Sequence, residues 1–591
     1  MLCLSAFVVS SQNEALAKNY FQQGEYEKAL HIYERLQRQA PGRLDYFLAL
    51  VETNQQLEKF NEAETLLHQR LTRRTPQPQL YIELGHNYAL QDKDSTATTY
   101  YKKAIEQLEI NPRYAYTLGR SFEKYNLLDE AVALYEKAMA LNPGIDFNIN
   151  LARIYGEQGA LEKMFFKYIE LVQDQPRYRS VVQRNFSQYI TEDPTNEANI
   201  KLRQALLRAL QQNPDILYNN LLSWLFVQQK DYKKALAQEK AIYKRTQGDL
   251  KGIKELLYIT LDDKAYGHAR DIAEFMVENA AAPNEKLLGE QNLIKIDTEL
   301  ATQKDYPAIE TKFQKLFEKY GTGTNVYALQ MDYNTFLAFK VGKQQQAIKN
   351  LKTLSQNKLG NYKTARVKML LADILVYSEK FNQALIYYSQ VQKKVKNDPL
   401  AQQARFKVAQ TSYYKGDFAW AQTQLDVLKK STSQLIANDA MQLSLTIRDN
   451  SLEDSTQTAL KKFAAADLLA LQLRYPQAIT AYQTILTDHK GEKIEDETLF
   501  KQGRLFEKTG QYERAEHNYL KIIQLYGQDI LADDAHYYLA QLYENQLEQP
   551  DKAKHYFEDF IYNFADSIYF VTARKRYRML RGDKIDRENI E

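Results

Sequence analysis

Gly24-Glu25-Tyr26-Glu27-Lys28-Ala29 shows the pattern that decides the fold: a small or polar residue, then Tyr or Phe, then Ala three places after the aromatic residue. The same pattern returns along almost the whole chain, at Phe60 and Ala63, Tyr232 and Ala235, Phe381 and Ala384, Phe418 and Ala421, and Tyr512 and Ala515. Recurrence of one short pattern at a near-constant spacing is typical of a solenoid, in which each repeat packs only on its neighbours. The sequence therefore predicts a repeat array rather than a globular enzyme.

Small residues at fixed places within each repeat indicate two helices that cross closely. With the aromatic residue counted as position 17, Gly119 and Ala131 fall at positions 8 and 20 of their repeat. Gly or Ala at these positions lets helix A approach helix B, while rings such as Phe122 and Tyr135 fill the remaining space. Proline at the end of the repeat, as at Pro143, stops helix B. Each repeat is therefore predicted to be a helix–turn–helix pair.

This arrangement resembles the tetratricopeptide repeat family over roughly residues 12–582. The resemblance implies an all-α fold, an α-α superhelix of about 13–15 helix–turn–helix repeats closed by a C-terminal capping helix. It also implies a concave groove, lined by helices A, that binds protein partners or peptide segments and uses no cofactor. The longer C-terminal repeats are similar to those of tetratricopeptide repeat proteins in the Gram-negative cell envelope, including outer-membrane assembly lipoproteins and periplasmic partners of envelope-spanning machines.

The distances between signature residues divide the chain into segments. The step from Leu161 to Tyr232 is 71 residues, which predicts one degenerate repeat between them, and the step from Phe418 to Tyr475 is 57, which predicts a spare helix near 436–447. The predicted segments are a regular array at 12–176, a degenerate repeat at 177–215, a middle array at 216–430, the spare helix at 431–458, a C-terminal array at 459–566, and a capping helix with its tail at 567–591.

Bulk composition excludes several classes of function. Lys and Arg number 78 against 75 Asp and Glu, a net charge of +3, so there is no broad positive field to attract nucleic acid or an anionic membrane. No apolar run approaches the roughly 18 residues of a membrane span. Cys3 is the single cysteine, which excludes an internal disulfide framework and a thiolate metal site.

The N-terminus carries the targeting evidence. Leu2 to Val9 is a short apolar run, and Val9-Ser10-Ser11 offers small residues at a signal-peptidase site, with Gln12 as the first mature residue. No positively charged region precedes the run. We interpret residues 1–11 as the remnant of a signal peptide, which predicts a periplasmic or cell-envelope location. The alternative is a cytoplasmic adaptor or regulatory protein in which these residues stay attached and pack on the first repeat.

Motifs for catalysis or metal binding do not emerge from the chain. The eight histidines are scattered, and none forms the His-x-x-x-His pair of a zinc site. Gly321-Thr322-Gly323-Thr324 is the glycine-rich stretch, but it lacks the lysine and the preceding strand of a phosphate-binding loop. The sequence therefore predicts a non-catalytic protein without a metal or other cofactor.

Partner-binding residues are predicted at the helix-A positions that face the groove. In the N-terminal array, Arg120 and Arg153 both fall at position 9 of consecutive repeats, with Asn150 beside them. Two guanidinium groups on one groove would suit a carboxylate or an acidic peptide. The alternative is that the arginines pair with groove acids such as Glu123 and Glu157.

The C-terminal half predicts a second binding surface that is rich in aromatic residues. Tyr and Arg are the residue types that anchor protein interfaces, and these types gather at its groove positions. The alternative is that half of the rings belong to the core between repeats. The predicted contact residues are Phe406, Tyr413, Tyr414, Phe500, Arg504, Tyr537 and Gln541.

A final amphipathic helix is predicted at 568–581. It carries Arg574, Lys575, Arg576, Arg578 and Arg581, which cover most of its circumference. We interpret it as a solvated cap over the last apolar face of the array. The alternative role is docking on an acidic partner, or peripheral association with anionic lipid headgroups.

Overall fold

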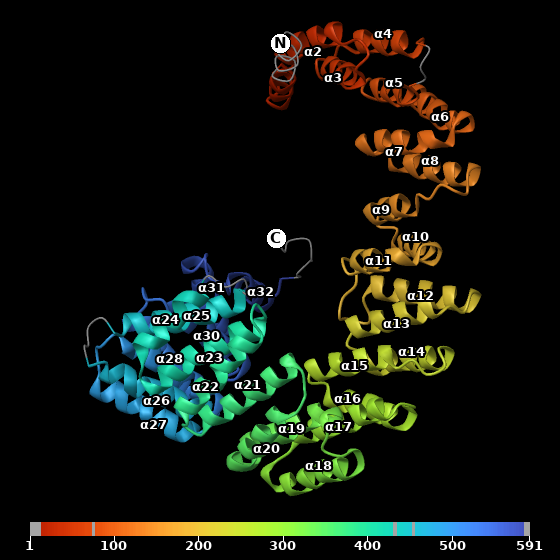
Figure 1. Ribbon diagram of the computed structural model, residues 1–591. Helices are drawn as coiled ribbons and strands as arrows, with labels where there is room; N and C mark the ends of the chain where they lie inside the picture. The colour runs from red at the N-terminus through yellow and green to blue at the C-terminus, as the bar shows by residue number, and fades with distance from the viewer. Residues whose placement is uncertain (1–12, 74–76, 430–433, 452–455, 584–591) are drawn as a thin grey trace, which may run out of the picture. The chain divides into compact units, whose positions relative to one another are not determined.

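The computed structural model describes residues 13–73, 77–429, 434–451 and 456–583 (Figure 1). The predicted signal-peptide remnant at 1–11 lies outside these ranges. Within them the chain is built of α-helices joined by short turns, and no residue is in a β-strand. The prediction of an all-α array of helix pairs is confirmed.

The chain forms two compact bodies, Met1–Gly289 and Glu290–Glu591, and α17 (Pro283–Leu300) spans the division between them. The predicted boundaries at 177–215 and 430–458 do not coincide with this division and stay predictions.

In the N-terminal body each helix A is followed by its helix B, and successive pairs stack on one another (Figure 1). After the helical residues 13–22, its helices are α2 (Tyr26–Gln39), α3 (Leu44–Gln56), α4 (Phe60–Leu71), α5 (Gln79–Ala89), α6 (Asp94–Ile110), α7 (Ala115–Lys124), α8 (Leu128–Leu141), α9 (Asn148–Glu157), α10 (Leu161–Asp174), α11 (Arg179–Phe186), α12 (Glu197–Gln212), α13 (Ile216–Gln228), α14 (Tyr232–Arg245), α15 (Lys251–Asp262) and α16 (Tyr266–Asn279).

The C-terminal body continues the alternation with one extra helix. Its helices after α17 are α18 (Tyr306–Tyr320), α19 (Tyr327–Phe336), α20 (Gln344–Gln356), α21 (Asn361–Tyr377), α22 (Phe381–Lys394), α23 (Pro399–Lys415), α24 (Phe418–Leu428), α25 (Gln434–Asp449), α26 (Thr458–Leu471), α27 (Tyr475–Asp488), α28 (Ile494–Lys508), α29 (Tyr512–Leu525), α30 (Ala532–Asn545), α31 (Pro550–Asn563) and α32 (Phe570–Arg581).

Signature residues mark the start of helix B. Tyr26, Phe60, Tyr232, Phe418 and Tyr512 are each the first residue of a helix B, as the repeat register predicts. In these repeats a residue with positive φ lies two places earlier and ends helix A, because a left-handed residue breaks the helical hydrogen-bond ladder. The A–B turn is thus set by local sequence.

Close approach of the two helices is confirmed at position 8. A Cβ built on Gly119 of α7 would lie 2.0 Å from the hydroxyl of Tyr135 on α8, so only glycine fits there. Buried tyrosine hydroxyls need an acceptor, and the Tyr135 Oη donates to Glu123 Oε1 at 2.9 Å. The same kind of bond joins Tyr388 to Asp373 at 2.6 Å. Tyrosine–carboxylate bonds therefore fasten helix B to helix A within a repeat.

Both irregular regions contain helices. The 177–215 region holds α11 and α12, and Ala198, Leu202 and Ala205 of α12 are buried as in a regular helix B. The spare helix is α25, which buries Ile436, Ala440 and Ile447 in the core of the C-terminal body.

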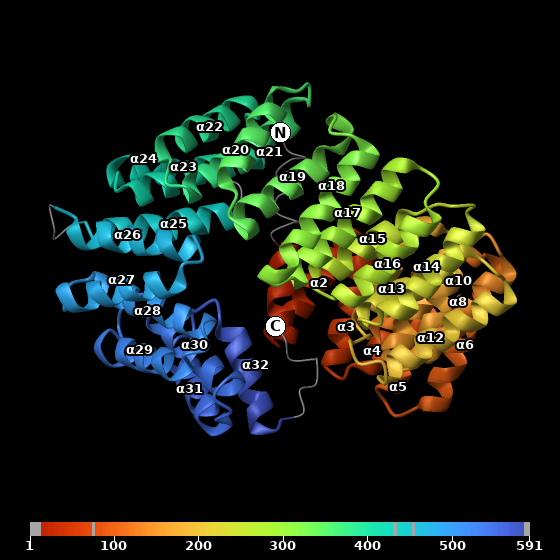
Figure 2. The ribbon, with the colours of Figure 1, turned by 90° about the horizontal axis from the view of Figure 1, so that it is seen from below.

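The inserted helix α25 changes how neighbouring repeats stack. In regular repeats helix B packs on the next helix A, as α22 does on α23 and α27 does on α28, whereas α24 packs on α25. The next helix A, α26, packs directly on α23. Figure 2 shows α25 between α24 and α27. Because α25 takes the place of a helix A beside α24, it separates the helices B α24 and α27. The helices A α23 and α26 stay in contact.

The last helix, α32, covers the end of the C-terminal body. It packs on α31 and buries Ala573, while Tyr569 just before it stacks on Tyr537 at 4.2 Å between ring centroids. Three of its cations are paired: Arg576 with Glu544, and Arg578 and Arg581 with Asp583. The positive charge of this helix is therefore partly neutralised, by Glu544 of α30 and by Asp583 just after the helix itself.

Candidate functional site

One row of side chains runs along the helices A of the N-terminal body at position 9 of each repeat: Lys18, Glu52, His86, Arg120 and Arg153. Lys124 of α7 reaches Glu52 of α3 at 3.0 Å, past the intervening α5. Helices A of three consecutive repeats therefore contribute to one surface.

The middle of this surface is an aromatic and acidic cluster. The ring of His86 stacks on Tyr125 at 3.8 Å, and Tyr125 donates to Glu83 Oε2 at 2.5 Å. Burial raises the pKa of Glu83. Burial, followed by the charge of Lys124, lowers the pKa of His86 to about 4. His86 is thus an uncharged ring at neutral pH, packed rather than poised to exchange protons.

Arg153 is held by acids, as the alternative interpretation expected. Its two terminal nitrogens contact Glu123 at 2.5 Å and Glu157 at 2.7 Å. Glu123 also accepts from Tyr135, beside which the partly buried Asn150 lies. The guanidinium group of Arg153 is therefore held in place by a network of hydrogen bonds and ion pairs.

Arg120 differs from Arg153. It is exposed and forms no ion pair with any residue that the structure describes. Its guanidinium carbon lies 6.0 Å from the centroid of Tyr116, whose ring is 59% exposed. On the next helix A, Ile149 at the position equivalent to Tyr116 is 39% exposed. We call Tyr116, Arg120, Ile149 and Arg153 the Tyr116 patch.

Two of the predicted contact residues in the C-terminal body are not at the surface. Tyr413 is 1% exposed and donates to Asp467 Oδ2 at 2.8 Å, and Tyr537 is 6% exposed beneath Tyr569. The sequence register placed both rings on the groove side of helix A. They are buried because α26 packs on α23 and the segment before α32 packs on α30. Neither ring is available for direct contact with a partner.

The other predicted residues of the C-terminal body are partly buried and already engaged. Phe406, Tyr414 and Phe500 pack against the core. Arg504 lies 3.9 Å from the ring centroid of Tyr538 and pairs with Glu507, and Gln541 donates to the Tyr537 hydroxyl at 3.0 Å. This surface is therefore more closed than the Tyr116 patch.

Sequence reasoning missed two carboxylates that organise the C-terminal body. Asp373 and Asp467 both occupy position 9 of their helices, and each accepts hydrogen bonds from buried tyrosines. The sequence signal that could have identified them is that both are carboxylates at position 9 of a helix A. Tyr377 and Gln472 exchange hydrogen bonds of 2.9 and 3.0 Å between the ends of α21 and α26. The C-terminal ends of α21 and α26, the two helices that carry these carboxylates, are therefore joined directly.

Asp534 links the capping segment to α30. It accepts from the Tyr569 hydroxyl at 3.1 Å. Burial, followed by the charge of Asp533, raises the pKa of Asp534 to about 6, against the opposing effects of Tyr569 and Arg504.

We predict that Asp534→Asn abolishes the loss of folding stability that the parent protein shows as the pH rises through about 6. A raised carboxyl pKa contributes stability at low pH that is lost as the pH rises through about 6. The variant should therefore unfold like the parent at pH 4 and be more stable by about 2 kcal/mol at pH 7.5, after allowance for partial exposure. Thermal unfolding at both pH values measures this. Asp551→Asn, at an exposed site on α31, is the control, and an equal pH slope in the parent and Asp534→Asn would contradict the prediction.

The described part of the chain contains no group of three or more His, Cys, Asp or Glu side chains that could hold a metal ion. Across the same residues, no helix combines the length and apolarity that crossing a membrane requires.

The fold and its exposed helix-A surface define a class of protein, a solenoid of helix pairs. The tetratricopeptide repeat model matches residues 15–42, 497–529 and 534–567. The last two matches cover the pairs α28–α29 and α30–α31, and the first ends with α2. The chain thus matches the tetratricopeptide repeat model in these three stretches, near both of its ends.

Among curated proteins, the chain is similar to the protein O-mannosyl-transferase TMTC1 of Homo sapiens, with 26% identity over 154 residues. The alignment spans 25% of this chain and 17% of that protein.

Among the solved structures that align with the chain, two have low similarity to it. The first is the APC/C hetero-tetramer Cut9-Hcn1, with 13% identity, a TM-score of 0.24, and 97% of this chain and 98% of that chain covered. The second is the P58(IPK) TPR domain, with 13% identity, a TM-score of 0.19, and 71% of this chain and 98% of that chain covered. TM-scores this low support no inference about the present chain.

Proposed function

We propose that the protein is a non-catalytic scaffold that holds partner proteins on the helix-A surface of its N-terminal body. The observation that carries the proposal is the Tyr116 patch, where an unpaired guanidinium group lies beside an exposed ring. Tyr and Arg supply most of the binding energy in many interfaces. Arg120 has donors free for a carboxylate, and Tyr116 and Ile149 offer apolar area next to it. A partner segment that combines an acidic and an apolar side chain fits this surface.

The helix-A surface of the C-terminal body is proposed as a second contact. Phe406, Tyr414, Phe500, Arg504 and Gln541 lie along it, with part of each side chain accessible. Since the polar groups of Arg504 and Gln541 already have partners, this contact would rest mainly on ring surface.

We further propose that the scaffold works in the cell envelope, in outer-membrane assembly, secretion or motility machinery. The apolar run from Leu2 to Val9 and the small residues before Gln12 support this location. Mass spectrometry of the native N-terminus tests it. A mature chain that begins at Gln12 supports export, whereas a retained Met1 with cytosolic partners supports the cytoplasmic adaptor.

The function is tested by crosslinked capture from fractionated native cells. Arg120→Ala combined with Arg153→Ala should leave helicity unchanged and reduce recovery of the specific partner by about tenfold or more. The matched control is Arg38→Ala with Arg208→Ala, which removes the same charge from exposed places on the helices B α2 and α12. Equal recovery by both double variants would show that the Tyr116 patch is not the binding site.

A further inference from the structure

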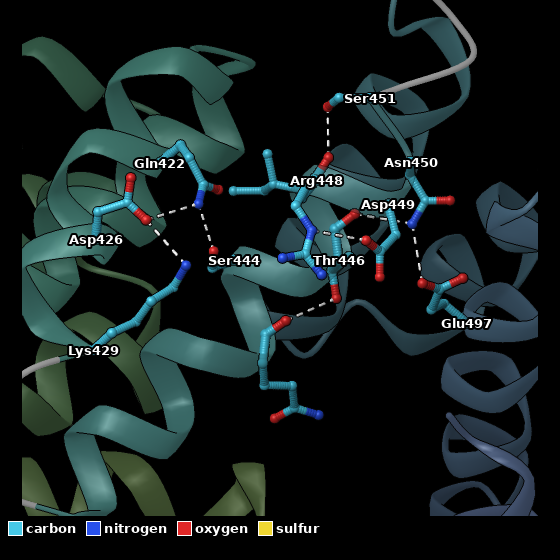
Figure 3. A network of polar contacts seen from close by, with 12 residues as sticks. Gln422, Asp426, Lys429, Ser444, Thr446, Arg448, Asp449, Asn450, Ser451 and Glu497 are labelled. Carbon is cyan, nitrogen blue, oxygen red and sulfur yellow. Dashed lines mark hydrogen bonds and ion pairs between the residues drawn. The ribbon is translucent and has the colours of Figure 1, made fainter. Parts of the chain in front are cut away.

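The inserted helix α25 is tied to α28 by one polar contact. Asn450, the residue after α25, donates from Nδ2 to Glu497 Oε1 at 3.0 Å and to the carbonyl oxygen of Thr446 at 2.9 Å (Figure 3). Both hydrogens of the Asn450 amide are therefore used, one within α25 and one across to α28.

Two oxygen atoms of this pair are left over. Asn450 Oδ1 and Glu497 Oε2 are both buried and have no hydrogen-bond partner within the described ranges. Figure 3 shows the amide and the carboxyl group facing each other, with the bonded Nδ2 and Oε1 on one side of the pair and Oδ1 and Oε2 both on the other. Buried acceptors without a donor are unfavourable, and one hydrogen shared between these two oxygens would satisfy both.

The surroundings of Glu497 disfavour its ionised form. Asp496, beside it on α28, is 6% exposed. Burial and the adjacent Asp496 raise the pKa of Glu497. Three cations on the surrounding helices form ion pairs with other acids: Arg448 of α25 with Asp449, Lys521 of α29 with Glu495, and Lys462 of α26 with Asp488 of α27. Glu497 forms no ion pair with any residue in the described part of the chain.

We propose that Glu497 carries a proton in the folded protein and donates it from Oε2 to Asn450 Oδ1, forming a reciprocal acid–amide pair that locks α25 onto α28. One hydrogen bond runs from the amide to the carboxyl group and the other runs back. The proton is taken up from water when α25 docks and is returned when α25 detaches.

The lock makes the attachment of α25 depend on pH. Detachment exposes Glu497 to water, where its carboxyl group ionises, so opening releases one proton. The equilibrium constant for opening therefore rises up to tenfold per pH unit while the pH lies between the ordinary carboxyl range and the raised pKa. Because α25 separates α24 from the following repeats, its release alters the spacing of helices along the C-terminal body.

Hydrogen–deuterium exchange of the full chain, followed by mass spectrometry between pH 5.5 and 8.5, tests the lock. Glu497→Gln is the matched variant, since its amide can donate to Asn450 Oδ1 and accept from Nδ2 without titrating. After correction for intrinsic exchange, protection of α25 should fall with pH in the parent and stay constant in Glu497→Gln. Identical pH dependence in the two proteins would overturn the proposal. Peptides from α22 should behave alike in both and serve as the internal reference.

Two further measurements test the proposal even if the side chain introduced by Glu497→Gln does not form the hydrogen bonds of the acid. Asn450→Leu, which has similar size but no amide, should leave α25 weakly protected at every pH. The infrared spectrum of the parent, with isotope-labelled glutamate, should contain a protonated carboxyl band at pH 7 that is missing from Glu497→Gln. Absence of that band from the parent would overturn the proposal whatever the exchange data show.

Discussion

Replacing Gly119 with alanine is expected to lower the free energy of unfolding by about 3 kcal/mol. The new methyl group would lie 2.0 Å from the hydroxyl of Tyr135, whose ring is fully buried between α7 and α8. Tyr135 must then shift, which breaks its bond to Glu123. Denaturant unfolding followed by circular dichroism measures the loss, and hydrogen exchange should localise it to α7 and α8.

Gly267→Ala is the matched control for this prediction. Gly267 is the second residue of α16, and nothing lies within 4 Å of a Cβ built there. Alanine is the better helix former, so this variant should be as stable as the parent or more stable by up to about 1 kcal/mol. If the two alanine variants had equal stability, close approach at position 8 would not be what fixes the A–B crossing.

The helix pairs could be predicted because their determinants are local. The residue at position 17 begins helix B, and the small residue at position 8 decides how near helix A comes, as Phe418 and Gly119 show. Both features act within one repeat, so a single repeat period identifies them. The pairing of Arg153 with Glu123 and Glu157 could be named as the alternative to partner binding because the three residues lie in the same or adjacent repeats.

Contacts that depend on how repeats stack could not be predicted in this way. The acceptor for Tyr413 is Asp467, 54 residues further along the chain and beyond the inserted helix. A helix register shows which face Tyr413 occupies, but it does not show that α26 covers this face. The same limit applies to Asn450 and Glu497, which meet only because α25 reaches α28. For this reason the sequence predicted both Arg120 and Tyr413 as partner contacts, although Arg120 is exposed and Tyr413 is buried.

Replacing Asp467 with leucine is expected to cost about 4 kcal/mol, because it removes the acceptor of two buried hydroxyls. Tyr413 donates to Asp467 from α23 at 2.8 Å, and Tyr482 donates from α27 at 2.5 Å. Burial raises the pKa of both phenols well above the ordinary value, as does the charge of Asp467, so they remain hydrogen-bond donors at any working pH. Unfolding of the full chain in denaturant, with exchange measured on α23 and α26, reports the loss.

The rescue of this variant separates a polar link from simple packing. Adding Tyr413→Phe and Tyr482→Phe to Asp467→Leu removes the stranded donors and should restore most of the lost stability, since an apolar replacement of a whole buried polar group can be nearly neutral. If the triple variant were no more stable than Asp467→Leu, the cost would come from the shape of the leucine. Recovery would instead identify Asp467 as the group that joins α23 to α26 past the inserted helix and so holds Tyr413 away from partners.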